Sequence, residues 1–273
     1  MTGWRFLGPM LAVGWSVLAV AHAALDDQPV RIRQEKQGNV VRLYADAVNC
    51  RDATITVEAD LTNMRAEPAL PTTVEMRDGR TVELGVLRPL APGTWNYRYR
   101  YHCLVGTRDG EPDDTLYQLP FAGSSRRLSQ GFQGKFSHQA GTNNEFALDW
   151  TMPIGTPVLA ARGGVVVAVR QDSTEGGTRD EHKRAANYIV VRHADGTYGE
   201  YLHLQAQGAR VRLGETVATG QLLGLSGNTG YSTLPHLHFA VFRTIDGQRR
   251  ETLPVKFQDR RGRPLTLREG QLY

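Results

Sequence analysis

Hydrophobic and polar residues alternate with a period of two along residues 39–103. The alternation is clearest in GTWNYRYRYHC, where four aromatic side chains share one face of an extended chain and polar side chains share the other. Turn-forming segments, RDGR and APGT, separate such runs. This pattern predicts short strands joined by turns, in a β-sandwich-like domain.

The aromatic face of this segment has two interpretations. Trp95, Tyr97, Tyr99 and Tyr101 could stack on sugars, or they could pack inside the sandwich. Aromatic residues are strong strand formers and bury large areas, which favours packing in the core.

The second half of the chain also lacks helical periodicity. Its candidate strands are TPVLAARGGVVVAVR, NYIVVRHADGTYGEYLHL, TVATGQLLGLSG and HLHFAVFR. An Asp-Gly pair in HADGTY predicts a tight hairpin, and the polar residues 172–186 predict a long exposed loop. We therefore predict an all-β chain, with a small polar linker at residues 122–127 between domains at residues 24–123 and 124–273.

The first 23 residues have the pattern of a cleaved export signal. Arg5 precedes an apolar run over residues 6–20, and AHA at residues 21–23 supplies small residues for cleavage. The alternative is an uncleaved anchor, but the run is shorter than the roughly 20 apolar residues that span a bilayer. We therefore expect a periplasmic or secreted protein with no stable membrane span after cleavage.

Export changes the interpretation of the two cysteines. An oxidising compartment favours pairing, so Cys50 and Cys103 are predicted to form a disulfide. Neither lies in a CxxC motif, so the sequence gives no support for a thiolate metal site.

The charge balance gives only weak information about partners. The formal charge of +4 becomes +3 once Arg5 leaves with the signal, a bias that fits an anionic polymer. No run of basic residues interleaved with aromatics indicates nucleic acid. Residues 249–268 are rich in arginine but also contain acidic residues, and are predicted to form a solvated face.

Two histidines in LPHLHF stand two residues apart within an apolar run. On a strand, His236 and His238 would project from the same face, so one could bind a metal while the other faces the bound ligand. Neutral imidazole is the commonest metal ligand in proteins. Upstream, His138 and Asp149 in FSHQAGTNNEFALDW could complete a His, Asp, His set for zinc.

Several motifs, in order, carry a family resemblance. ALDW.MPIGTPVLAARGGVVV, NYIVVRH.DGTYGEYLHL, G..V..GQLLGLSGNTGYST and PHLHFAV resemble the lysostaphin-type (LytM-type) zinc metallopeptidases of family M23 over residues 130–242. The resemblance implies a Gly-rich antiparallel β domain with a substrate groove, and cleavage of peptide bonds in bacterial peptidoglycan.

The resemblance also implies a division of roles. His138, Asp149 and His238 match the three ligands of Zn²⁺, and His203 and His236 match the two catalytic histidines. We assign His236 as general base and His203 as stabiliser of the oxyanion, although these two roles could be exchanged. The sequence departs from the family where Asp149 follows His138 by 11 residues, since the commonest first motif is HxxxD, and at Leu234, where glycine is frequent.

The sequence therefore predicts a secreted zinc endopeptidase that acts on peptidoglycan cross-links or stem peptides. The alternative is a non-catalytic module of the same fold that binds peptidoglycan or activates another hydrolase. A purely structural zinc site would need a fourth protein ligand. The sequence carries no signal for the role of the N-terminal domain, the bond that is cut or the oligomeric state.

Overall fold

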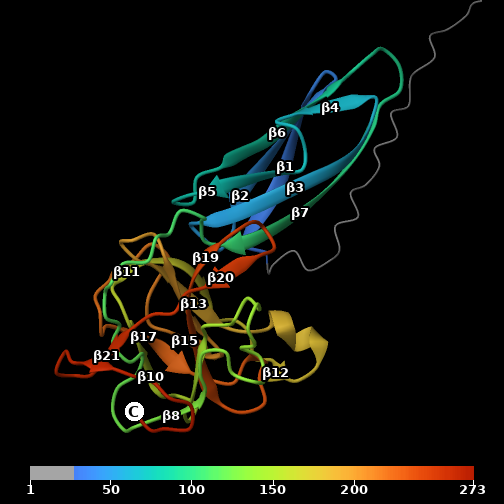
Figure 1. Cartoon of the computed structure of the whole chain (residues 1–273). Helices are drawn as coiled ribbons and strands as arrows, with labels where there is room; N and C mark the ends of the chain where they lie inside the picture. Colours follow the sequence, from blue (N-terminus) through green and yellow to red (C-terminus); the bar gives the residue numbers. More distant parts are fainter. Residues whose placement is uncertain (1–27) are drawn as a thin grey trace, which may run out of the picture.

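The computed structural model describes residues 28–273, so the predicted signal at residues 1–23 lies outside the described residues. Figure 1 shows an elongated upper part built from the first strands and a lower part built from the rest of the chain. Within residues 28–273 the only helix is the short 3-10 helix η1 (Asp180–Arg184). No helix described there is long and apolar enough to cross a bilayer. The all-β prediction is confirmed.

The first strands form two antiparallel sheets with the orders β1-β2-β6-β4 and β5-β3-β7. Their bounds are β1 Val30–Gln37, β2 Val40–Ala47, β3 Ala53–Thr62, β4 Met64–Glu67, β5 Thr72–Met76, β6 Val82–Pro89 and β7 Asn96–Val105. Val41 and Leu43 of the first sheet and Ile55 and Val57 of the second belong to one buried cluster. The two sheets thus share a core.

The aromatic face of β7 points toward this core. Trp95, Tyr97, Tyr99 and Tyr101 are partly buried and pack against the cluster, while the alternate residues of the strand are more exposed. The packing interpretation of this face is confirmed over sugar stacking.

The remaining strands build a larger sheet with the order β16-β11-β13-β14-β19-β9-β8, and β20 pairs with β19. Their bounds are β8 Arg127–Gln130, β9 Leu148–Thr151, β11 Gly164–Arg170, β13 Tyr188–Arg192, β14 Tyr198–Leu202, β16 Thr216–Val217, β19 His236–Thr244 and β20 Arg250–Thr252. The predicted Asp-Gly hairpin joins β13 to β14, where His193 N donates to Thr197 O (2.8 Å).

Smaller pairings flank this sheet. One sheet has the order β10-β17-β15, and β12-β18 and β21-β22 are two-stranded pairs. The bounds are β10 Pro157–Leu159, β12 Gly176–Gly177, β15 Leu204–Ala209, β17 Leu222–Ser226, β18 Gly230–Tyr231, β21 Phe257–Gln258 and β22 Pro264–Leu265. Most of residues 172–186 are exposed, as predicted, but the segment is not a simple loop, because its β12 pairs with β18 and His182 of η1 is buried.

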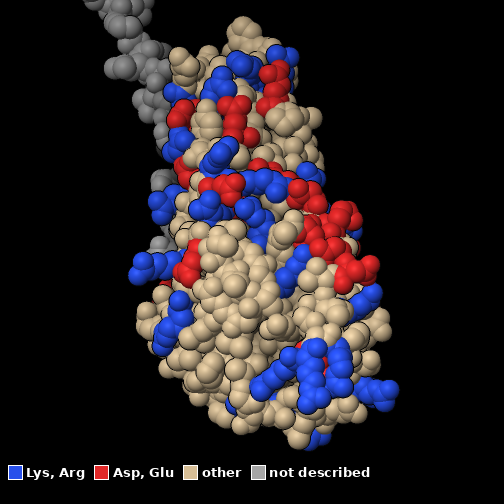
Figure 2. Space-filling model, turned by 90° about the vertical axis from the view of Figure 1, so that its left-hand side faces the viewer, with Lys and Arg blue, Asp and Glu red and all other residues tan. Residues whose placement is uncertain are grey.

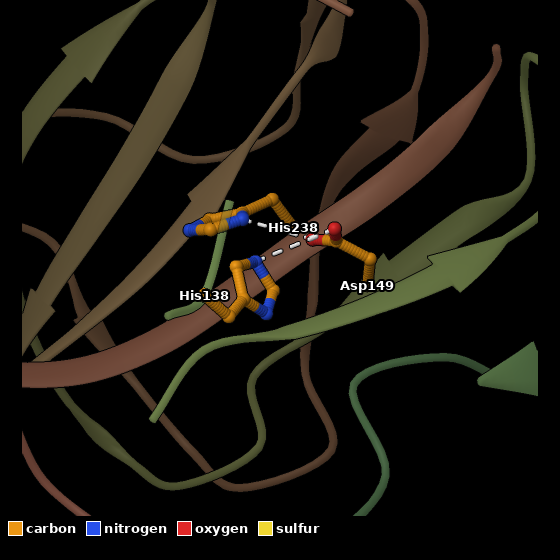
Figure 3. Close-up of side chains that lie close together, drawn as sticks. All are labelled: His138, Asp149 and His238. Carbon is orange, nitrogen blue, oxygen red and sulfur yellow. Dashed lines mark hydrogen bonds and ion pairs between the residues drawn. The ribbon is translucent and has the colours of Figure 1, made fainter. Parts of the chain in front are cut away.

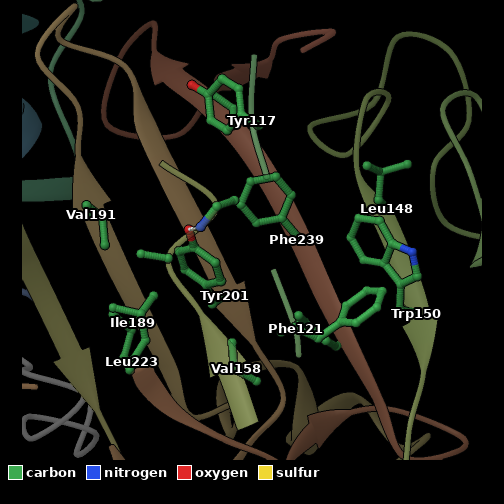
Figure 4. Packing of buried hydrophobic residues seen from close by; sticks show 14 of the residues in the cluster. Tyr117, Phe121, Leu148, Trp150, Val158, Ile189, Val191, Tyr201, Leu223 and Phe239 are labelled. Carbon is green, nitrogen blue, oxygen red and sulfur yellow. Dashed lines mark hydrogen bonds between the residues drawn. The ribbon is translucent and has the colours of Figure 1, made fainter. Parts of the chain in front are cut away.

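One face of the large sheet covers an aromatic core. Figure 4 shows Phe239 of β19 among Tyr201, Trp150 and Tyr117, each of which is buried. Tyr117 lies before the predicted domain boundary at residues 123/124, as does Phe121 of the same core. The boundary stays a prediction, but part of the segment before it packs with the second domain.

The opposite face of β19 connects the two halves of the chain. Period-two alternation places His236 and His238 on the same face as Phe242. Phe242 belongs to the buried cluster of the N-terminal sheets, together with Val190 and Tyr198 of the large sheet. The N-terminal sheets are therefore held against the face of the large sheet that carries the two histidines.

The predicted disulfide is absent, since Cys50 and Cys103 are both free thiols. The Cys50 thiol donates to Pro29 O (3.2 Å) and the Cys103 thiol to Gln28 Oε1 (3.4 Å). Burial raises the pKa of each thiol to about 12. Each cysteine is therefore held as a protonated thiol.

Charged side chains are distributed unevenly over the surface. Figure 2 shows acidic and basic side chains intermixed over the upper part of one face and a group of basic side chains lower down. Arg260, Arg261 and Arg263 are exposed in the turn between β21 and β22, and Arg263 pairs with Asp259 (2.7 Å). Their exposure agrees with the solvated face that the sequence predicts.

Candidate metal centre

The pairing of β9 with β19 brings two of the predicted ligands together. His238 lies directly opposite Asp149 in the antiparallel register, and opposed residues on one face have Cβ atoms roughly 4.5–5.5 Å apart. Nδ1 of His238 lies 2.9 Å from Oδ1 of Asp149. The register between the strands therefore fixes this contact.

His138 reaches the same place from the loop between β8 and β9. Its side chain is fully buried, and Nε2 lies 3.4 Å from Oδ2 of Asp149. Figure 3 shows the His238 ring above the His138 ring, with both rings turned toward the Asp149 carboxylate. The 11-residue spacing between His138 and Asp149 is therefore compatible with their predicted association.

The surroundings of His138 leave Nε2 of its ring without a hydrogen-bond donor. Nδ1 lies 3.2 Å from Gly131 O, and a carbonyl oxygen can only accept, so Nδ1 carries the proton of the neutral ring. Nε2 is buried without a hydrogen-bond partner and faces a carboxylate, which is also an acceptor. Two acceptors in this position fit a cation between them.

The three side chains form a compact set of nitrogen and oxygen ligands. One ligand atom each from His138, Asp149 and His238 lies within 4.8 Å of the others. Burial alone would raise the pKa of Asp149, but the contacts with His138 and His238 hold it well below its usual value. Asp149 is therefore ionised at neutral pH, as a metal ligand must be.

His203 and His236 stand beside this set. Their ring centroids are 4.4 Å apart, and Nε2 of His236 lies 3.8 Å from Oδ1 of Asp149. His203 follows β14 directly and has a φ of 62°, an uncommon conformation that costs roughly 1–3 kcal/mol and clusters at functional sites. All five residues predicted for the site therefore lie together.

Backbone carbonyls set the tautomers of these two histidines. Nδ1 of His203 donates to Thr229 O (2.7 Å), and Nδ1 of His236 donates to Leu234 O (2.8 Å). In the neutral rings Nε2 is then unprotonated and can accept a proton. Burial lowers the pKa of both, that of His203 to about 3 with a further contribution from the neighbouring histidines, so both are neutral at pH 7.

The predicted exposed insertion supports the loop that orients these histidines. Gly230 N donates to Glu175 O (2.9 Å), and Asn187 N donates to the Thr229 hydroxyl (3.0 Å). The Ser232 hydroxyl lies 3.1 Å from Nδ1 of His236. This supporting role could not be predicted, because the insertion is distant from the histidines along the chain.

A substitution at Gly230 tests this support. Gly230 has a φ of 83°, and an added Cβ would lie 2.6 Å from Ala186 Cβ. Gly230→Ala should therefore shift the loop that carries Thr229 and lower kcat by about 100-fold, while metal content is retained. Gly38→Ala is the matched control, since Gly38 has a φ of 59° with nothing within 4 Å. Equal kcat values for the two variants would contradict the supporting role.

The other histidines within residues 28–273 lie outside the centre. His193 is buried, with Nδ1 3.0 Å from Gly163 O, and burial lowers its pKa to about 4. His182 is buried in η1, and His102 is exposed on β7. Glu145 is an acidic residue close to Asp149 along the chain, but it is not one of the three ligands. Its carboxylate accepts hydrogen bonds from Gln133 Nε2 and Gly141 N (2.8 Å each).

Comparison with known proteins gives a consistent family match. Residues 143–251 match the model of the family described as Peptidase family M23. His138 precedes the matched residues, so its place in the centre rests on the geometry above.

Two curated relatives illustrate the match. The peptidoglycan DD-endopeptidase ShyA of Vibrio cholerae is 35% identical over 138 residues, which cover 49% of this chain and 29% of the relative. Lysostaphin of Staphylococcus simulans is 39% identical over 95 residues, which cover 34% of this chain and 17% of the relative. The matched segment thus spans less than a third of each relative.

Two solved structures align with parts of this chain. The catalytic domain of lysostaphin from Staphylococcus simulans aligns with a TM-score of 0.34 and 30% identity, over 47% of this chain and 88% of that chain. A zinc-containing peptidase from Vibrio cholerae aligns with a TM-score of 0.37 and 21% identity, over 83% of this chain and 54% of that one. The family match and the sequence relatives identify residues 143–251 as a domain of peptidase family M23.

Proposed function

We propose that this protein is an exported zinc-dependent endopeptidase that hydrolyses peptide bonds in peptidoglycan. The observation that carries the proposal is the unpartnered Nε2 of His138, which faces Asp149 beside His238 and two further histidines. Three nitrogen and oxygen ligands with no fourth protein ligand are typical of a catalytic zinc site. The relatives named as peptidoglycan and glycyl-glycine endopeptidases support the substrate class.

The donor set fits zinc better than magnesium or calcium, which prefer oxygen ligands. His138 Nε2, a carboxylate oxygen of Asp149 and His238 Nδ1 would hold the ion. When bound, zinc polarises a scissile carbonyl and lowers the pKa of its water to about 7.

We assign proton transfer to the two histidines beside the ligands, His236 and His203. His236 Nε2 is unprotonated in the neutral ring and lies 3.8 Å from Asp149 Oδ1, whose negative charge favours a proton on His236. We assign His236 to take the proton of the attacking water and deliver it to the leaving amine. The oxyanion assignment of His203 depends on a proton gained during the reaction. Its Nδ1 donates to Thr229 O and the ring is neutral at pH 7, so Nε2 can donate to an oxyanion only after the ring is protonated; without that proton, Nε2 fits the exchanged role of general base.

Export to the periplasm or cell surface is part of the proposal. It rests on the pattern of residues 1–23, with an apolar run followed by small residues at 21–23. Peptidoglycan lies outside the cytoplasm, so the proposed substrate and the proposed location agree.

Removal of the metal provides the direct test. We expect the protein of residues 24–273 to be purified with stoichiometric zinc and to cleave defined muropeptides, with fragments identified by mass spectrometry. Dialysis against a chelator should abolish cleavage and added zinc should restore it, because the attacking water depends on the ion.

Two substrates would show which of the bonds suggested by the relatives' names is cut. One is a directly cross-linked muropeptide dimer, and the other is a dimer joined by a glycine bridge. A protein that holds no zinc, cuts neither substrate and still binds peptidoglycan would contradict the enzyme assignment and support the non-catalytic module.

A further inference from the structure

Gln130 is the last residue of β8 and lies between Asp149 and the segment that leads into His138. Its side chain is buried, with 5% of its surface exposed. Oε1 accepts hydrogen bonds from Phe136 N (2.9 Å) and Ser137 N (3.0 Å). Nε2 donates to the Ser137 hydroxyl and to Oδ2 of Asp149, each at 2.9 Å. A glutamine amide has two N–H donors and two acceptor sites, and all four are used here.

An irregularity in strand pairing aims this side chain at the centre. The register of β8 against β9 shifts between Leu128 and Gln130, so that Gln130 lies opposite Asp149. The Ser129 hydroxyl donates to Asp149 O (3.0 Å) at the shift. Bulges of this kind redirect side chains and are frequent beside functional sites.

The contacts of Gln130 connect the ligand loop to the ligand carboxylate. His138 directly follows Ser137, and the loop that carries it, residues 131–147, has no strand or helix of its own. Ordering such a loop costs conformational entropy at each residue. The backbone of Gly131, the next residue, adds the carbonyl that accepts from His138 Nδ1 (3.2 Å). Gln130 and Gly131 together therefore anchor the loop, set the tautomer of His138 and orient the carboxylate of Asp149.

We propose that Gln130 is a positioning residue that makes the 11-residue spacing between His138 and Asp149 usable for metal binding. The inference rests on the proposed function, because it assumes that these two residues are ligands. Gln130 itself does not touch the metal or the substrate. It fixes Oδ2 of Asp149 on one side and the start of the His138 segment on the other, so that both ligands are in place before the ion arrives.

Close packing around Gln130 gives a second way to disturb it. A Cβ added to Gly134 would lie 2.4 Å from Gln130 Cγ and 3.0 Å from Gly131 O. Gly134→Ala should therefore displace the Gln130 side chain while its amide remains.

The test is the zinc dissociation constant, measured by competition with a chromogenic chelator. Gln130→Met keeps the length of the side chain and removes its hydrogen bonds, and we expect zinc to bind about 10–100-fold more weakly, as for other residues that orient ligands. Gly134→Ala should weaken zinc binding in the same direction. Gln133→Met is the matched control, since Gln133 lies in the same loop but donates to Glu145 Oε1 (2.8 Å) rather than to a ligand. It should leave zinc affinity unchanged.

The melting temperature of each zinc-free variant separates positioning from folding. A merely structural role would lower this temperature and leave the zinc affinity of the folded protein equal to that of the parent, which would overturn the proposal. If Gln130→Met does not fold, Gly134→Ala decides by the same comparison. A parent protein that binds no zinc would refute the proposed function, whereas a zinc-binding parent with unaffected variants would refute only the role of Gln130.

Discussion

Replacing His238 by alanine should remove both zinc and peptidase activity, whereas replacing His236 should remove activity and leave most of the zinc. His238 Nδ1 lies 2.9 Å from Asp149 Oδ1, within the ligand set. His236 is outside that set, and its unprotonated Nε2 faces the same carboxylate at 3.8 Å. Loss of a general base costs typically 10²–10⁴-fold in rate. Metal content and the rate of muropeptide cleavage, measured on the same preparations, check both parts.

A control histidine and a clear contrary result accompany this pair. His102→Ala should retain zinc and activity, because His102 is exposed on β7 and lies 3.7 Å from Glu58 rather than near the ligands. If His236→Ala cleaved muropeptides as fast as the parent, the general-base assignment would be wrong. If His238→Ala kept its zinc, the ligand set itself would be wrong.

The predictable part of the site is the part that follows from strand geometry. Two residues of one strand at i and i+2 share a face, so the association of His236 with His238 could be predicted from LPHLHF alone. The pairing of β9 with β19 then places Asp149 opposite His238, a contact that the family resemblance implied but local sequence does not encode.

The unpredicted part depends on contacts between distant segments. Gln130 acts through a register shift in β8, and no pattern of apolar and polar residues marks that shift. His203 combines a positive φ with a bond from its ring to Thr229 O, 26 residues away, and its local sequence marks neither feature. The insertion at residues 172–186 is polar and reads as a loop, yet its β12 pairs with β18 through backbone groups, which composition does not reveal.

The packing of the N-terminal sheets against the large sheet also could not be predicted from the sequence. Alternation over residues 39–103 predicts strands with one buried face, but it does not say that the same cluster includes Val190, Tyr198 and Phe242 of the large sheet. The structure shows one continuous hydrophobic core across the junction. The N-terminal sheets are therefore expected to be a fixed part of the folded unit that carries the histidines.

Removal of Arg192 should destabilise the whole chain through this junction. Arg192 of β13 contacts both carboxylate oxygens of Asp52 (3.1 and 2.8 Å), and Asp52 is fully buried beside β3. The Tyr198 hydroxyl (3.1 Å) and Asp78 N (3.0 Å) donate to the same carboxylate. Removing one partner of a buried ion pair leaves an uncompensated charge and costs about 3–5 kcal/mol. We expect Arg192→Ala to lower the free energy of unfolding, measured by urea denaturation, by that amount.

The exposed pair between Arg42 and Glu83 (2.8 Å) provides the matched comparison, because both side chains are about 40% exposed. Arg42→Ala should lower the free energy of unfolding by only about 0–1 kcal/mol.

Since one core spans the junction, tryptophan fluorescence and circular dichroism should report a single unfolding transition in the parent and in Arg192→Ala. Two separated transitions in the parent would show that the N-terminal sheets unfold independently, and a loss below 1 kcal/mol in Arg192→Ala would show that the Asp52 carboxylate reaches water without its partner. Either outcome would contradict a junction that acts as buried core.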